Sequence, residues 1–124
     1  MKPKPFLIIL LVAFISVASV ADRSNGDAGN GFSYDEIKFK EYRDDGLEMS
    51  GEITNYSGQN FKFVVFDLAL YDNEGNIMDT KMCGMVRFMD GECKRFEELL
   101  EGRLRNLSGF SVRYVYSANL PGGQ

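Results

Sequence analysis

The chain has 124 residues and a formal net charge of −4, from 14 Lys or Arg against 18 Asp or Glu, and it contains no His. The lack of His excludes Ser-His-Asp triads, His-based acid–base catalysis and the zinc sites that combine His with two Cys. An acidic chain also lacks the basic footprint of a nucleic-acid-binding protein. Because no nucleophile motif or phosphate-binding loop is present either, we expect a protein that is not an enzyme and needs no cofactor.

The N-terminus has the three parts of a secretory signal peptide. Lys2 and Lys4 are followed by an apolar run from Phe6, and small residues end it at Ser19-Val20-Ala21. We expect a signal peptide over residues 1–21, cleaved before Asp22, with Ala18 as the second choice of cleavage site. The alternative is an uncleaved anchor through residues 6–21, which is shorter than the ~20 residues that span a bilayer. The expected location is therefore secreted or at the cell envelope.

Residues 22–33 are expected to form a flexible linker, because positions 22–31 carry no apolar side chain larger than Ala and are rich in Gly and Asn. The same composition also fits a disordered tail left after cleavage. The folded domain is expected over residues 34–118. Residues 119–124 are expected to be a frayed C-terminal tail. Without the signal peptide the chain would carry 12 basic and 18 acidic residues, a net charge of −6.

From Ile37 onward the apolar residues recur with a period of two, which is typical of half-buried strands. A first strand around 37–40 is separated by a turn at 44–46 from a second at 47–54. The most apolar stretch, 61–71, is expected to be a central strand, with Val64, Phe66, Leu68 and Leu70 on its buried side. A Gly-containing turn at 72–76 then leads into a partner strand from Ile77 to Met82.

The last third of the chain continues the pattern. A turn at 89–92 precedes a strand at 93–97, and a closing strand covers 110–117. The stretch 96–107 is expected to be strand plus loop, with a short helical turn as the alternative. Several short strands separated by Gly and Asp turns predict an all-β fold, a small antiparallel β-sandwich.

Several of these residues resemble a known family. The run Gly51–Gly58, the strand end Leu68-Ala69-Leu70-Tyr71-Asp72, and the turn Met89–Glu92 followed by Phe96 are similar to the FxLYD domain. The chain departs from that pattern at Leu68, where the family has Phe, and at Asp90, where it has Pro. The resemblance implies an immunoglobulin-like sandwich in an exported or envelope-attached prokaryotic protein. It implies no catalytic residues.

Cys83 and Cys93 are expected to form a disulfide, since an exported domain folds in an oxidising compartment. Closing so short a loop would stabilise the domain by ~3 kcal/mol. A tight hairpin around Asp90, however, would place Cys93 opposite Phe88, so the segment between the cysteines would have to loop out. The alternative is a pair of buried free thiols.

Other clusters have a simpler structural interpretation. The oxygen-rich run at Asp72, Glu74, Asn76 and Asp79 is better explained by a turn than by a calcium site, and Glu97, Glu98 and Glu101 by a solvated face. The sequons at Asn55 and Asn106 are candidate glycosylation sites. Four methionines surround Cys83, which suggests a Cu(I) site, although irregular core filling explains them as well. They are Met78, Met82, Met85 and Met89.

The function we expect is a non-enzymatic interaction module whose partner is an unidentified envelope or extracellular protein. Contact is expected through loops or an exposed sheet edge. The candidate segments are 55–60, 72–76 and 82–89, and the last is expected to be irregular and to expose apolar side chains. Its candidate contact residues are Met85, Val86, Phe88 and Met89. The alternatives are a structural component of a surface or secretion assembly and a copper-binding protein. A membrane partner is expected only if residues 6–21 are retained as an anchor.

Overall fold

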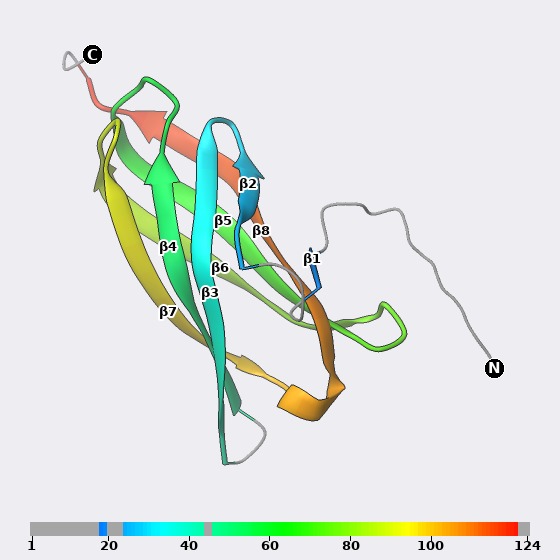
Figure 1. Ribbon diagram of the computed structural model, residues 1–124. Helices are drawn as coiled ribbons and strands as arrows, with labels where there is room; N and C mark the ends of the chain where they lie inside the picture. Colours follow the sequence, from blue (N-terminus) through cyan, green and yellow to red (C-terminus); the bar gives the residue numbers. More distant parts are fainter. Residues whose placement is uncertain (1–17, 20–23, 44–45, 122–124) are drawn as a thin grey trace.

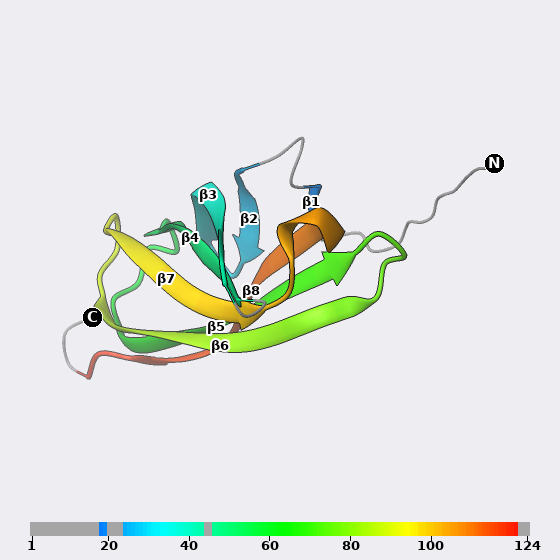
Figure 2. The same cartoon turned by 90° about the horizontal axis from the view of Figure 1, so that it is seen from below.

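Two antiparallel sheets pack face to face, as the sequence predicts, in a computed structural model that describes residues 18–19, 24–43 and 46–121 (Figure 1). Sheet A has the strand order β1-β8-β5-β6, and sheet B the order β2-β3-β4-β7. The strands are β1 (Ala18–Ser19), β2 (Gly26–Gly29), β3 (Phe32–Tyr42), β4 (Gly46–Asn55), β5 (Phe61–Asp72), β6 (Ile77–Phe88), β7 (Cys93–Glu101) and β8 (Leu107–Asn119). The two layers are seen end-on in Figure 2.

The central strand of sheet A confirms the predicted alternation. In β5 the side chains of Val64, Phe66, Leu68 and Leu70 are all fully buried between the sheets. Their neighbours Phe63, Val65 and Asp67 lie on the opposite face of the sheet and are partly exposed. This pattern follows from the period of two in a strand that is paired on both sides, by β8 and by β6.

Sheet B follows the same rule. Along β4, buried and partly buried residues alternate without interruption, and Leu47, Met49 and Ile53 enter the core. The buried Gly51 shares this inward face, where a Cβ would overlap the Cδ1 atom of Ile37. Gly51 therefore lets β3 and β4 approach closely.

An aromatic cluster centred on Phe32 fills one end of the core. The Phe32 ring lies edge-on to Phe66 at a centroid distance of 5.1 Å, and it stacks on Tyr114 at 5.9 Å. The rings of Phe61 and Phe88 complete the cluster at 5.6 and 5.5 Å. These rings come from both sheets, so the cluster holds the two layers together.

The prediction of a flexible linker over residues 22–33 is wrong for its described part. Residues Gly26–Gly29 form β2, which pairs with β3, and Phe32 is fully buried. A strand can form here without large apolar side chains because it is held by backbone pairing, and the tight reversal into β3 uses residues at positive φ. Those residues are Gly29, Asn30 and Gly31.

The segment 82–89 is also more regular than expected. It is not an irregular loop, because β6 runs unbroken to Phe88 and pairs with β5 throughout. The only departure in backbone angle is Arg87, at a φ of 51°, just before the strand ends. Between β7 and β8 the chain forms a loop with one short 3₁₀ turn, Leu104–Asn106, in agreement with the strand-plus-loop prediction.

The ends of the chain are only partly described. The predicted signal peptide lies outside the described residues except for Ala18 and Ser19, which form β1 and pair with Phe110 and Gly109 of β8. At the other end, Asn119 is the last residue of β8, and the Leu120 amide donates to the Asn60 carbonyl at 3.1 Å. The predicted tail thus begins as part of the sheet.

Candidate functional site

The exposed apolar side chains of sheet A gather on its outer face. Strand register brings them together: Val86 of β6 lies opposite Phe63 of β5, and Val65 lies between Gly84 and Tyr116. The Phe63 and Tyr116 rings meet edge-to-face at a centroid distance of 5.8 Å. Exposure is 68% for Val86, 59% for Met82 and 53% for Tyr116. The term "apolar face" is used below for this set of residues, Phe63, Val65, Met82, Val86 and Tyr116.

The apolar face arises from strands with apolar residues on both sides. In a half-buried antiparallel sheet, the outward positions are normally polar. Here β5 has Phe63 and Val65 at outward positions, whereas β4 in sheet B has Glu48, Ser50 and Glu52 at its outward positions. Scattered apolar residues on a surface need no explanation, but a contiguous group across three strands indicates a contact surface.

Basic residues accompany the apolar face. Lys62 comes directly before Phe63 in the sequence, and Arg87 comes directly after Val86. Arg113 lies on β8 opposite Asp67 of β5. All three basic side chains are exposed, and none forms an ion pair with the described residues. Asp67 does not form an ion pair with Arg113 despite the register, and Arg87 interacts electrostatically with Glu92 without forming an ion pair.

Sheet B has a different charge arrangement. Within the described residues, every ion pair takes its carboxylate from sheet B or from the turn before β7. Arg95, for example, lies 3.6 Å from Glu52 and 4.0 Å from Glu97. Most basic residues in the strands of sheet B are therefore in ion pairs, with Lys40 as the exception, whereas those beside the apolar face of sheet A are in none.

The predicted contact residues are only partly at the surface. Val86 is exposed, but Met85 and Phe88 are core residues at 7% and 0% exposure, so the prediction is wrong for these two. Met89 is half-buried in the turn before β7. The error came from expecting a loop: in a strand, alternate residues point to opposite faces, so Val86 and Met85 cannot share a surface. The predicted contact residues did not include Met82, Phe63 or Tyr116, because these residues come together only through the register of three paired strands.

The predicted disulfide is not formed, and this prediction is also corrected. Cys83 and Cys93 are free thiols, the first buried in β6 and the second exposed in β7. They belong to different sheets and are not register partners: Cys83 pairs with Phe66, and Cys93 with Thr54. Burial, with a smaller contribution from the nearby Glu98 carboxylate, raises the pKa of the Cys83 thiol from 9.0 to about 12. Cys83 is therefore an unreactive core residue.

The oxygen and sulfur clusters do not form metal sites. The Asp72 carboxylate accepts from the amides of Glu74 and Asn76, both at 2.9 Å, which is the predicted turn. Met85 is buried with Cys83, whereas Met82 is on the outer face, so the sulfur atoms do not converge. Among the residues that the structure describes, no group of three or more His, Cys, Asp or Glu side chains is placed to hold a metal ion.

Asn55 is fully buried and joins two loops, which rules out the Asn55 sequon as a modification site in the folded domain. Its side-chain amide donates to the carbonyls of Gln59 at 2.9 Å and Phe88 at 3.2 Å. Its side-chain carbonyl accepts from the Ser57 amide at 2.8 Å, and its backbone carbonyl accepts from the Gly91 amide at 2.7 Å. The 55–60 segment is thus a structural junction. Asn106, in the second sequon, is exposed.

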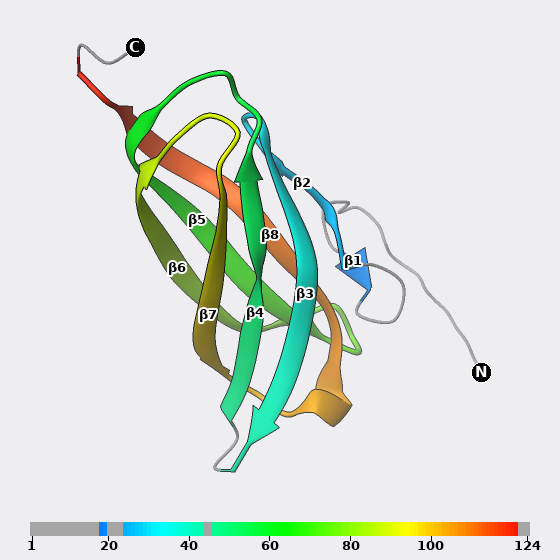
Figure 3. The same ribbon diagram turned by 60° about the vertical axis from the view of Figure 1, so that its left-hand side comes forward.

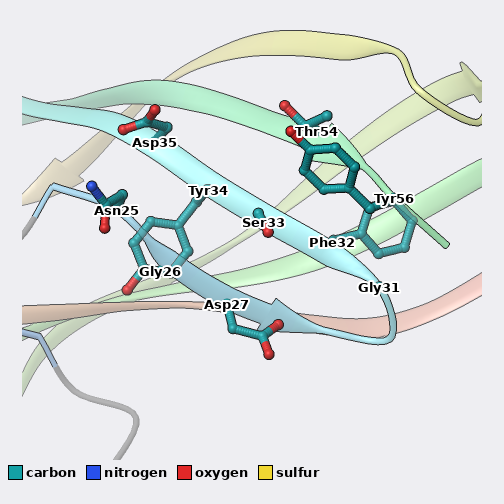
Figure 4. A pocket seen from close by; sticks show the side chains of 10 residues that line it. All are labelled: Asn25, Gly26, Asp27, Gly31, Phe32, Ser33, Tyr34, Asp35, Thr54 and Tyr56. Atoms are coloured by element: carbon teal, nitrogen blue, oxygen red, sulfur yellow. The ribbon is translucent and has the colours of Figure 1, made fainter.

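A shallow hollow of about 560 Å³ lies over β2, β3 and the end of β4 (Figure 4). The figure shows Asp27 on β2, Asp35 on β3 and the exposed Tyr56 ring around it. Both carboxylates accept nearby backbone amides at 2.8 Å, Asp27 from Gly29 and Asp35 from Glu36. Their local hydrogen bonds shape the strand ends, so these carboxylates do not by themselves indicate a ligand.

No helix within the described residues is long and apolar enough to span a membrane. No protein-family model, curated protein or solved structure matches this chain.

Proposed function

We propose that this chain is an exported, non-enzymatic module that binds another protein through the apolar face of sheet A. The observation that carries the proposal is the contiguity of Val86, Phe63 and Tyr116 on one exposed surface. Such a group exposes apolar area that a soluble domain normally buries, and covering it gains roughly 25 cal/mol per Å².

Export is the second part of the proposal. It is supported by the basic start, apolar run and small-residue end of residues 1–21. N-terminal sequencing of the protein recovered outside the cytoplasm tests it, and a mature start at Asp22 is the expected result. Recovery of only an intact Met1 end in the soluble cytoplasm would contradict export.

FxLYD membership is also part of the proposal. The residues that carry the resemblance have structural roles that a shared fold would require. Asn55 joins two loops, Leu68 is fully buried, and Gly91 has a φ of 85° in the turn before β7. Since Leu68 packs in the core, its replacement of the family's Phe is a mild change.

Photo-crosslinking tests the binding surface. A photoreactive side chain at Val86 in the full-length exported protein should form adducts with a partner protein. The matched control is Leu99, which is 56% exposed on β7 of sheet B. The proposal requires adducts from position 86 that are absent from position 99. Equal labelling at both positions, or none at 86, would exclude the apolar face as the contact surface.

A further inference from the structure

Strand β6 is an edge of sheet A. The strand order leaves it paired only with β5, and no strand pairing joins it to β7, the neighbouring edge of sheet B. Figure 3 shows the two strands meeting at the turn that connects them. A strand with one unpaired side has free backbone N–H and C=O groups that can bind another strand.

Part of this edge is closed by its own side chains. Asp79 of β6 accepts the Glu101 amide at 2.8 Å, and Lys81 donates to the Leu99 carbonyl at 3.2 Å. Both contacts are to the β7 backbone. Beyond Lys81, the Cys83 side chain lies beside Glu98 of β7, and the Lys94 Nζ atom of β7 lies 5.8 Å from the centroid of the Phe88 ring.

The stretch Met82–Val86 lacks the features that usually protect an edge. It has no charged residue, no Pro and no bulge. At its centre is Gly84, where an added Cβ would have no heavy atom within 4 Å. The surface over the middle of the edge is therefore flat and open, and it continues directly into the apolar face.

The charges beside this edge indicate the chemistry of its partner. Arg87 is exposed at the end of β6 and forms no ion pair with the described residues, so an incoming segment gains from a carboxylate at the end that lies beside it. A second copy fits less well, because antiparallel pairing centred on Gly84 would bring Lys81 of one copy opposite Arg87 of the other. An anionic lipid surface satisfies the charges but not the free backbone groups of β6.

We infer that the Met82–Val86 edge of β6 accepts an extended segment of another protein as an added strand. The apolar side chains of that segment extend the apolar face beyond Met82 and Val86, and a carboxylate at its end lies near Arg87. Main-chain hydrogen bonds supply affinity, and the flanking charges supply specificity and register. This inference rests on the proposed function and specifies the partner as an apolar strand with an acidic end.

Synthetic peptides test the inference directly. The probe is a fluorescent nine-residue peptide of alternating Val and Thr with two Glu at each end, and binding to the mature protein is measured by anisotropy. A second peptide carries N-methyl groups along one edge, which removes the donors that β6 would bind. A third replaces Glu by Lys. We expect the first peptide to bind, and the other two to bind at least ~10-fold more weakly.

Variants of the protein complete the test. Arg87→Glu should reverse the preference between the Glu and Lys peptides, and Leu99→Asp should leave it unchanged. Thermal unfolding of each variant checks that it folds. Equal binding of the N-methylated peptide, or no binding of the Glu peptide, would overturn strand addition.

Two other occupants would also overturn the inference. One is a second copy, detected as dimerisation in sedimentation that Val86→Asp abolishes. The other is a lipid surface, detected as flotation with phosphatidylglycerol vesicles that Arg113→Glu abolishes. If the peptides fail while crosslinking from position 86 still captures a protein, the proposed function stands and only strand addition falls.

Discussion

The side-chain amide of Asn55 donates to the backbone carbonyl of Phe88 at 3.2 Å, across 33 positions of the sequence. This bond ties the end of β4 in sheet B to the end of β6 in sheet A. The Asp90 amide donates to the Asn60 side chain at 2.8 Å, and the Gly58 amide donates to the Asp90 carboxylate at 2.9 Å. The two loops that change sheets are thus held to each other by polar side chains.

Replacing Asn55 by Ala should therefore destabilise the domain by about 2–4 kcal/mol, because several buried backbone groups lose their partners. The free energy of unfolding in urea measures the effect. The matched control is Asn106→Ala in the exposed sequon, for which a change below ~0.5 kcal/mol is expected. Similar small changes for both variants would show that the Asn55 junction does not hold the sheets together.

Replacement by Ala should have opposite effects on stability at Gly51 of β4 and at Gly84 of β6. At Gly51 an added Cβ would overlap Ile37 and lie 3.1 Å from the Phe96 ring, so Gly51→Ala should cost about 1–3 kcal/mol. At Gly84 the space is open and φ is not positive, so Gly84→Ala should be neutral or stabilise by up to ~1 kcal/mol. Urea unfolding of both variants measures this. A Gly51→Ala protein as stable as the wild type would mean that β3 and β4 are not tightly packed there.

The alternation of residues predicts the sheets better than it predicts the site. The faces of β4 and β5 follow directly from their apolar period of two, and the Asp72 turn from its residue types. By contrast, β2 has no apolar period, since it is held by backbone pairing with β3. The apolar face depends on the register of three strands, which brings Val86 opposite Phe63 and places Tyr116 beside Val65. Register is a long-range property that local sequence patterns do not specify.

The missing disulfide illustrates the same limit. The oxidising compartment expected from the predicted signal peptide favours a Cys83–Cys93 pair, but the chain changes sheets between them, which sends one thiol into the core and leaves the other in solvent. A thiol-specific reagent should therefore label one cysteine in the native protein and two in denaturant. Labelling of Cys93 alone before unfolding is expected. A native protein without reactive thiols that releases two upon reduction would instead show a disulfide.

The raised pKa of Cys83 also predicts a dependence of stability on pH. In the unfolded chain the thiol ionises near its ordinary value of 9.0, whereas in the folded protein its pKa is about 12. Above pH 9 the unfolded state thus binds fewer protons than the folded state, so stability is highest below pH 9 and falls as the pH rises toward 12. Cys83→Val should remove this component from the unfolding free energy measured between pH 8 and 10.5. An identical slope in both proteins would contradict it.

Cleavage of the proposed signal peptide should change the protection of β8. In the uncleaved chain, Ala18 and Ser19 pair with Phe110 and Gly109 as the short edge strand β1. Cleavage before Asp22 would remove β1 and leave that part of β8 as a free edge, while the pairing between β5 and β8 remains. Amide hydrogen exchange should then be faster at residues 109–110 in the mature protein than in the uncleaved precursor, with no change at 112–116, where β8 is paired only with β5. Equal exchange at 109–110 in both forms would mean that β1 does not protect this edge.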